Sequence, residues 1–549
     1  MTIPVKRPVV EIATAPQMRL FDIADLVVEP GVLPRPGVRF TEPDPRELYF
    51  GGLRVDEFLQ SMGQGWTLKV RAFLLSLDYG PFAEKYKGGG RPPYAPVLMV
   101  GLVLYGIMKG VSSLRDLEVL ARVDLGAMWI AGGIAPDHSV LGRFLNLHRE
   151  VLTESYFEDL TRKVLKETGG DAKSVAGDGT VVQAAASRYG TLKAEAAAQA
   201  AREARERAEQ DASNVALAAR AKQAELGAKV AAEREESRRA NGRESKGGVV
   251  SPSEPEAVIQ PLKTHAVAPS YKPSILANDQ RIIVGCTVEP SSEIAAVKPM
   301  LEQAERIGGE KVEQALFDAG YRADEVITIS LEKDIDLLCP EGKAKHDDDW
   351  EKNSDKQFPK SRFIYDETQD TYRCPANETL VPFERYKGNE KFAGYTKYRT
   401  PFCAECPLKA KCTKSEQGRT LKRLSGDEAK DALRQVMTQE GARKRYRKRQ
   451  AMVEPVFSEL KREQGLERFR RRGLVAVRLE FALHACAHNL RRMLAIGLSA
   501  ATARLAALLV VLILLVFWSY GHLSRSVFGR KQHRDVTFFR DIRNTVLSS

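Results

Sequence analysis

Apolar residues in the first third of the chain recur at the spacing of helices. In RPPYAPVLMVGLVLYGIMKG, Pro96 opens a long apolar run, and proline is tolerated in the first turn of a helix. In the segment that follows, Leu114, Leu117 and Leu120 fall on one face of a second helix. A third helix is expected over PDHSVLGRFLNLHREVL.

Polar residues stand where two of these helices should begin. Ser112 or Ser113 precedes the second helix, and Asp137 or Ser139 precedes the third. Such side chains accept hydrogen bonds from the free N–H groups of a first helical turn. Three short helices with tight links resemble a helix-turn-helix module, but an all-α packing domain that never touches DNA fits equally well.

After residue 166 short apolar strands alternate with amphipathic helices. Residues 171–189 indicate a strand or hairpin around a central aspartate, and from Ile282 strands and helices follow in β-α-β order. Two segments interrupt this order. Residues 191–246, rich in Ala, Glu, Arg, Lys and Gln, predict a long solvated helix or a helical pair, and residues 342–420 are polar, aromatic and Cys-bearing.

The C-terminal region contains an unbroken apolar stretch, Leu505–Trp518, and no Asp, Glu, Lys or Arg occurs between Arg504 and Arg525. Its length is borderline for a membrane span, so we favour a buried helix or a tail unrelated to function, and a membrane is not expected as a partner. The expected domains are an extended or disordered arm (1–45), an all-α N-terminal domain of the DNA-binding type (46–165), an α/β domain with the insertions 191–246 and 342–420 (166–496), and an apolar tail (497–549).

Charge narrows the choice of partner. The 549 residues carry a formal charge of +12, with a pI of about 9.2, and nucleic acid is the first partner to consider for such a chain. Positive charge is densest in residues 443–472, where twelve Lys and Arg accompany four Glu. The N-terminus shows no apolar secretory segment, and seven cysteines do not suggest a secreted disulfide framework, so a cytoplasmic protein is expected.

Three acidic residues lie in sequences that suit a divalent metal. Asp178 stands in AGDGTVV between glycines that allow close approach. Asp318 ends an apolar strand in ALFDAGY, where α/β sheets place their ligands. Glu454 lies in the basic segment, and Lys461, two helical turns later, shares its face. Carboxylates bind Mg²⁺, and Lys and Arg side chains bind phosphate groups. Their combination predicts metal-dependent phosphodiester chemistry on nucleic acid.

Each of these features has a simpler interpretation. A strand-end aspartate such as Asp178 or Asp318 is often a turn former or a helix cap. The helix around Glu454 could present a solvated face with ion pairs, although its excess of positive charge argues against neutralisation within the segment. Pro455 suits a first helical turn, so the helix is expected to restart or kink at Glu454.

As an ordered set, these motifs resemble the DDE transposases of bacterial insertion sequences, and among them the branch with a Tyr-Arg-Glu-Lys signature around the catalytic Glu. GDGT at Asp178, DAGY at Asp318 and VEPVF at Glu454 carry the resemblance. The segments YAPVLMVGLVLYGIMKGVSSLRDLE, PDHSVLGRF, EPEAVIQ, YKPSI and HACAHNL extend it over about residues 50–496.

The resemblance implies an α/β fold with a ribonuclease-H-like catalytic domain. It implies Mg²⁺ or Mn²⁺ held by Asp178, Asp318 and Glu454. The partner would be double-stranded DNA, as the terminal inverted repeats of the element and as target DNA. Cleavage would release 3′-hydroxyls that attack the target, within a homodimer that holds two ends, and the protein would associate with the bacterial nucleoid.

The signature also implies which residues contact DNA near the cut. Tyr446, Arg449 and Lys461 match the signature by position. Three residues usually separate the Arg from the Glu, but four separate Arg449 from Glu454, so Arg447 is an alternative. A catalytically inactive DNA-binding relative, or a metal-dependent endonuclease without strand transfer, fits the same pattern. The presence of all three carboxylates favours an active enzyme.

Cysteines suggest a second metal. FCAECPLKAKC holds Cys403, Cys406 and Cys412, and Cys374 in YRCP is a candidate fourth ligand; four cysteines favour structural Zn²⁺. Reduced thiols in the core of the insertion are the alternative. A second group, His484, Cys486 and His488, lies on an apolar helix without the glutamate of an HExxH site, and core packing is expected there.

Overall fold

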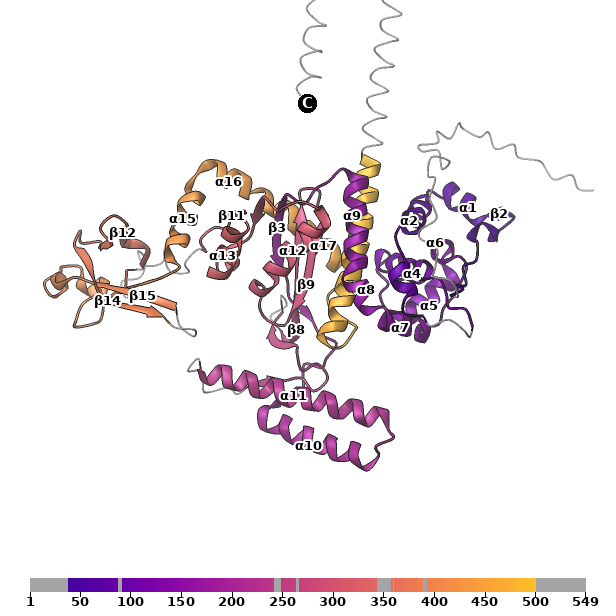
Figure 1. Cartoon of the computed structure of the whole chain (residues 1–549), viewed down its shortest axis with the longest axis horizontal. Helices are drawn as coiled ribbons and strands as arrows, with labels where there is room; N and C mark the ends of the chain where they lie inside the picture. The colour runs from indigo at the N-terminus through magenta and orange to yellow at the C-terminus, as the bar shows by residue number, and fades with distance from the viewer. Residues whose placement is uncertain are drawn as a thin grey trace, which may run out of the picture. The chain divides into compact units, whose positions relative to one another are not determined.

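The computed structural model describes residues 38–499, apart from 87–90, 241–247, 263–265, 343–356, 359 and 389–392 (Figure 1). All but the last few of these residues belong to one compact unit, Leu26–Met493. Most of the predicted N-terminal arm and the whole apolar stretch Leu505–Trp518 lie outside the described residues. Within the described ranges, no helix is long and apolar enough to cross a membrane.

The N-terminal segment is helical apart from one short β-hairpin. Helix α4 starts at Pro96, as predicted, and is buried along its whole length, so it forms the core of this segment. Helix α7 is capped by the Asp137 carboxylate, which accepts from the N–H groups of Ser139 and Val140. The elements are η2 (Pro45–Glu47), β1 (Tyr49–Phe50), β2 (Leu53–Arg54), α1 (Val55–Ser61), α2 (Trp66–Leu75), α3 (Gly80–Ala83), α4 (Pro96–Met108), α5 (Leu114–Val123), α6 (Leu125–Ile130), α7 (His138–Leu147), α8 (Arg149–Thr153) and α9 (Ser155–Thr168).

A mixed β-sheet forms the centre of the α/β part. Strands β11, β10 and β3 are parallel, whereas β8 runs antiparallel to β3 and pairs with β4, β7 and β9. Its strands are β3 (Ser174–Gly179), β4 (Val182–Gln183), β7 (Val258–Pro261), β8 (Val267–Asn278), β9 (Ile283–Glu289), β10 (Gln314–Leu316) and β11 (Asp336–Leu338). The predicted strands at 171–189 and after Ile282 are therefore confirmed.

Helices cover this sheet and fix the ends of its strands. Helix α12 (Val297–Gly308) packs on β9, where a Cβ atom at Gly285 would stand 2.6 Å from the Met300 carbonyl oxygen. The helix over residues 474–499 bonds to β9 through Asn489, whose amide accepts from the Ile283 N–H and donates to the Ile283 carbonyl. The other elements are η3 (Ile294–Ala296), η4 (Ala319–Tyr321), α13 (Asp324–Glu332), α15 (Asp427–Thr438), α16 (Glu440–Tyr446) and α17 (Lys448–Arg462).

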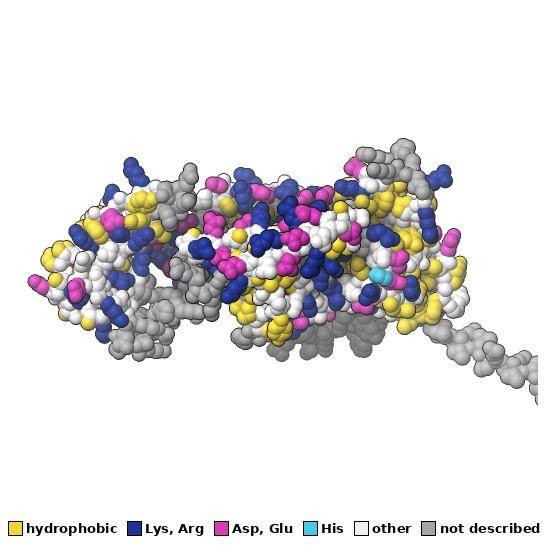
Figure 2. Space-filling view, turned by 90° about the horizontal axis from the view of Figure 1, so that it is seen from below, with side chains coloured by type: hydrophobic (Ala, Val, Ile, Leu, Met, Phe, Trp, Pro, Cys, Tyr) yellow, Lys and Arg dark blue, Asp and Glu magenta, His cyan; other side chains and the backbone are white. Residues whose placement is uncertain are grey.

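The first predicted insertion is a helical pair. Helices α10 (Ala194–Gln210) and α11 (Val215–Ala240) pack against each other and against the two-stranded pair β5 (Leu192–Lys193) and β6 (Val249–Val250). Their shared core is small and rich in alanine. Figure 2 shows Lys and Arg side chains interleaved with Asp and Glu on the side where this pair lies, as expected for a solvated helical surface.

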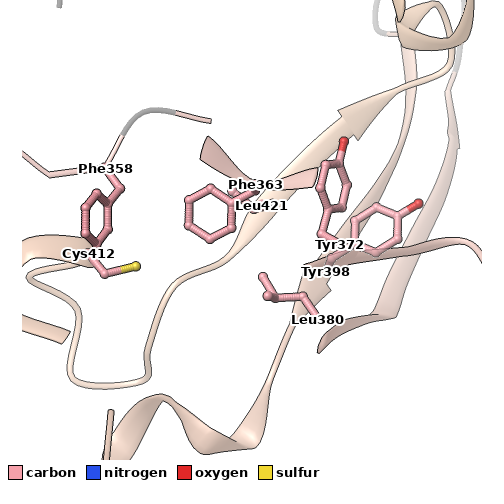
Figure 3. Close-up of a cluster of buried hydrophobic side chains, with 7 residues drawn as sticks. All are labelled: Phe358, Phe363, Tyr372, Leu380, Tyr398, Cys412 and Leu421. Atoms are coloured by element: carbon pink, nitrogen blue, oxygen red, sulfur yellow. The ribbon is translucent and has the colours of Figure 1, made fainter. Parts of the chain in front are cut away.

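The second insertion forms a small antiparallel sheet, which we call the cysteine module (residues 357–424). Its core consists of its own residues, among them Phe363, Tyr372 and Tyr398 (Figure 3). The module reaches Leu424, slightly beyond the predicted insertion. Its elements are η5 (Lys360–Arg362), β12 (Ile364–Asp366), β13 (Thr371–Arg373), β14 (Thr379–Gly388), β15 (Ala393–Arg399), η6 (Pro401–Ala404), α14 (Lys409–Cys412) and β16 (Leu421–Leu424), with the sheet order β12-β13-β14-β15-β16.

Candidate active site

Asp178 and Asp318 lie at the same level on neighbouring parallel strands. Ala176 of β3 stands opposite Leu316 of β10, and each aspartate follows two residues later along its strand direction. Because neighbouring strands lie about 4.8 Å apart, the two carboxylates meet at the carboxyl edge of the sheet. This edge is where the sequence predicted a ligand site.

Arg449 lies between these two carboxylates. Its Nη2 atom is 3.1 Å from Asp178 Oδ1 and 3.8 Å from Asp318 Oδ2, and its Nε donates to the Gly177 carbonyl at 3.3 Å. The arginine side chain is only 12% exposed. One cation therefore compensates two acidic groups that come from different strands.

Backbone N–H groups orient both aspartates. Asp178 Oδ1 accepts from the Gly179 N–H at 2.9 Å, and Asp318 Oδ1 accepts from the Gly320 N–H at 2.9 Å. Burial raises the pKa of Asp178, while the Arg449 charge and the Gly179 N–H oppose that rise. The Asp178 carboxylate therefore ionises less readily than usual, and a nearby cation favours its charged form.

The glycines beside Asp178 serve the packing of protein side chains. A Cβ atom at Gly177 would stand 2.0 Å from the buried Phe317 ring, and one at Gly179 would stand 2.9 Å from Glu293 Cδ. From the sequence, we interpreted these glycines as leaving space for the close approach of a ligand. In the structure Phe317 and Glu293 occupy it.

Gly177→Ala should lower stability because the new methyl group overlaps the Phe317 ring. We expect the free energy of unfolding to fall by about 1–3 kcal/mol, the usual cost of overpacking. Chemical denaturation measures it. Gly179→Ala is the matched control, since its neighbour is the end of the flexible Glu293 side chain. Equal stability of Gly177→Ala and the wild type would contradict the packing described for this strand.

Glu454 lies on α17, the helix that also carries Arg449 and Lys461. Its side chain is exposed and makes no hydrogen bond or ion pair with the described residues. Lys461, seven residues later on the same side of the helix, donates to Thr180 Oγ1 at 2.7 Å, two residues beyond Asp178. Helix α17 thus lies along the strand that carries Asp178, with Glu454 at its solvent edge.

The helix does not restart at Glu454, so that part of the sequence prediction was wrong. Helix α17 runs unbroken from Lys448 to Arg462 with Pro455 inside it. Proline lacks the N–H that would bond to the carbonyl four residues earlier. That carbonyl, of Ala451, accepts a hydrogen bond from Arg281 Nε at 3.0 Å instead. A side chain from outside the helix therefore satisfies the group that Pro455 leaves free.

The two other predicted DNA contacts differ in position. Tyr446 ends α16 and is partly buried; burial raises its pKa, and the charges of Asp318 and Asp178 add to the rise. Arg447, the alternative to Arg449, is exposed between α16 and α17. The structure thus brings Arg449 to the aspartates and leaves Arg447 at the surface.

Residues 69–147 match the family Transposase domain (DUF772), and residues 373–494 match the family Transposase DDE domain. These matches indicate a transposase. They support a DDE transposase of the insertion-sequence type, and the second match includes Arg449, Glu454 and Lys461 but not the segments with Asp178 and Asp318. No curated protein matches the chain.

Two charged residues that the sequence analysis missed lie beside the aspartate pair. Glu293, at the start of η3, contacts Gly179 and lies 3.4 Å from Lys272 Nζ of β8. Lys272 belongs to the YKPSI motif, but nothing in the sequence near Glu293 marks it. The pairing of β3 with β8, and of β8 with β9, brings these residues to the strand that carries Asp178.

The sequence predictions for cysteine and histidine clusters differ in outcome. His484, Cys486 and His488 are buried, and His484 Nδ1 lies 2.8 Å from the side-chain amide of Gln464, so the prediction of core packing is confirmed. The cysteines of the second insertion line one small cavity. Within the described ranges no three His, Cys, Asp or Glu side chains are already arranged to hold a metal ion.

Arg449→Met should destabilise the metal-free protein. The variant leaves the half-buried Asp178 carboxylate beside Asp318 without its cation. Removing one partner of a buried pair costs about 3–5 kcal/mol, and we expect about 1–3 kcal/mol here because the Asp318 side chain is 46% exposed to solvent. Chemical denaturation in EDTA measures this loss.

Addition of Mn²⁺ should restore more stability to Arg449→Met than to the wild type, because a bound ion stabilises the folded state. Arg447→Met is the control, since it removes an exposed arginine two positions away. If both variants match the wild type in EDTA, Arg449 does not compensate the aspartates.

Proposed function

We propose that this transposase cuts DNA at the ends of an insertion sequence and joins the released 3′-hydroxyls to target DNA, with Asp178, Asp318 and Glu454 as ligands of Mg²⁺ or Mn²⁺. The observation that carries the proposal is the position of Arg449. One guanidinium reaches two carboxylates from separate strands, so both acidic groups face a place that suits a cation.

The residues present fit a hard divalent ion. Asp178 and Asp318 offer carboxylate oxygens, which Mg²⁺ prefers, and the unpaired Glu454 carboxylate projects from the helix that lies along β3. When bound, the ion would activate a water or a 3′-hydroxyl and stabilise the leaving oxygen. Arg449 would then exchange its contacts with the aspartates for a DNA phosphate.

The surrounding cations suit the DNA backbone. Arg447 is exposed beside the site, Lys461 reaches Thr180 next to β3, and Tyr446 lies near the aspartates. In this proposal these residues and Arg449 contact the strand near the cut, as in the branch with a Tyr-Arg-Glu-Lys signature. The helical N-terminal domain would bind the inverted repeats, and a homodimer would hold two ends.

Strand order favours a ribonuclease-H-like catalytic domain. Across the sheet, β8 lies antiparallel beside β3, and β9 lies antiparallel beside β8. The parallel strands β10 and β11 lie on the other side of β3. Such a domain places its acidic residues on the central strands and on a following helix, as Asp178, Asp318 and Glu454 are placed here. We propose that the protein works in the bacterial cytoplasm, on the nucleoid.

A DNA assay tests the proposal. DNA ends that flank the chain's own coding sequence, incubated with the purified protein, Mg²⁺ and a target plasmid, should yield nicked ends and end–target joints, and EDTA should prevent both. Nicks without joints would indicate an endonuclease without strand transfer. Binding without nicks would indicate a catalytically inactive relative.

A further inference from the structure

The four cysteines of the cysteine module come from separate places in its sequence and line one cavity. Cys374 follows β13, Cys403 lies in η6, Cys406 follows that turn, and Cys412 ends α14. All four are free thiols. The cavity between them measures about 20 Å³, enough for one water-sized body.

The module has a hydrophobic core of its own, and that core is small. It contains Phe358, Phe363, Leu380 and Leu421 with two tyrosines and Cys412 (Figure 3). Folded units of fewer than about 70–80 residues seldom gain enough stability from such a core, and many add disulfides or a structural metal. Residues 357–424 fall in this range, so a metal bound within the module would add to its stability.

The backbone comes close to two of the sulfurs, and at Cys374 it offers an N–H group that a thiolate would accept. The chain turns tightly after Cys374, whose N–H donates to the Glu378 carbonyl at 2.9 Å, and the Glu378 N–H points at the Cys374 sulfur at 3.3 Å. An N–H bond to a charged acceptor is stronger than one to a neutral acceptor. Gly418, at φ +92°, passes so close to Cys403 that a Cβ there would stand 3.0 Å from its sulfur.

Two cations line the same cavity. Lys409 and Arg419 are among its lining residues, and Arg419 packs over Phe363 while its Nη1 donates to the Cys412 carbonyl. Arg419 Nε is buried and has no hydrogen-bond partner among the described residues. Four thiolates around one Zn²⁺ carry a net charge of −2, which two adjacent cations offset.

We propose that Cys374, Cys403, Cys406 and Cys412 bind one structural Zn²⁺ that holds the cysteine module together. Four cysteine ligands make a typical closed zinc site, which leaves no position for a substrate. The four thiols would lose their protons to solvent on binding. The sulfurs must draw together around the ion, because no three ligands in the described ranges are yet arranged for it.

Metal content tests this proposal without reference to DNA chemistry, so its outcome is independent of the proposed transposase activity. Full-length protein purified without chelator should contain about one zinc per chain by elemental analysis. Replacement by Co²⁺ should give the absorption bands of a tetrahedral thiolate site. A wild-type protein without zinc, or with a Cys403–Cys406 disulfide found by alkylation and mass analysis, would overturn the proposal.

The double variant Cys403→Ser/Cys406→Ser should lose the zinc, and protease should then cut within residues 357–424. Cys286→Ser is the matched control, because Cys286 lies on β9 outside the module; it should keep the full zinc content. If the double variant does not fold, titration of the native wild type with a chelator replaces it, and protease cuts should again appear in the module as zinc leaves. Full zinc in a folded double variant would overturn the assignment of these ligands.

Discussion

Asp178→Asn should abolish DNA cleavage and leave DNA binding almost unchanged. Asparagine keeps the size of the side chain and can still accept from the Gly179 N–H, but it removes the negative charge that a divalent ion needs. Loss of one group that stabilises a transition state commonly costs about 10²–10³ in rate, and loss of a metal ligand should cost at least as much.

The comparison needs an aspartate from the same sheet that lies away from the site. Asp336 begins β11 at the opposite edge and pairs with Arg445 at 2.7 Å. Asp336→Asn should therefore cut DNA at nearly the wild-type rate. Gel assays of nicking and of DNA binding on the same preparations separate the two effects. Cleavage retained by Asp178→Asn would remove this residue from the metal site.

Such a test is possible because local patterns in the sequence already marked Asp178 and Asp318 as candidate metal ligands. Each follows a short apolar strand, and apolar runs bounded by glycine and polar residues are strong strand signals. What no local pattern contains is the register between strands. The pairing of Leu316 with Ala176 is set by the whole sheet, and it brings the two aspartates to one level.

The choice between Arg447 and Arg449 also depended on tertiary structure. Spacing along the sequence left both possible, since neither has the usual separation from Glu454. In the structure the helical turn directs Arg449 toward β3, where it reaches Asp178, and leaves Arg447 exposed. Side-chain direction on a helix changes by about 100° per residue, so a shift of two residues turns a side chain from the protein surface toward the site.

Several elements had no clear signal in the sequence. Strand β8 (Val267–Asn278) is the longest strand of the central sheet, but Pro269 and Pro273 interrupt its pattern, and proline is rare in central strands. The strands of the cysteine module are short and rich in charge, and they hold together through pairing and a shared core. For Pro455, the sequence did not show that Arg281 would bond to the free carbonyl of Ala451.

Glu454→Gln should also abolish cleavage, and this effect is the second large one. The DDE family match covers this residue and the structure places it on the helix that carries Arg449 and Lys461. Its exposed carboxylate makes no ion pair within the described ranges, so the substitution should cost little stability. A loss of activity would therefore report on chemistry, with an expected size of at least about 10²-fold, as for other groups that stabilise a transition state.

The most direct measurement compares Mg²⁺-dependent cleavage of the element's own ends by the wild type, by Glu454→Gln and by Glu463→Gln. Glu463 is a neighbouring glutamate, 59% exposed and paired with Arg491, so its variant controls for the loss of one negative charge in this segment. We predict cutting by the wild type and by Glu463→Gln, and none by Glu454→Gln, with all three proteins binding DNA. Equal cutting by Glu454→Gln and the wild type would contradict a metal site built from Asp178, Asp318 and Glu454.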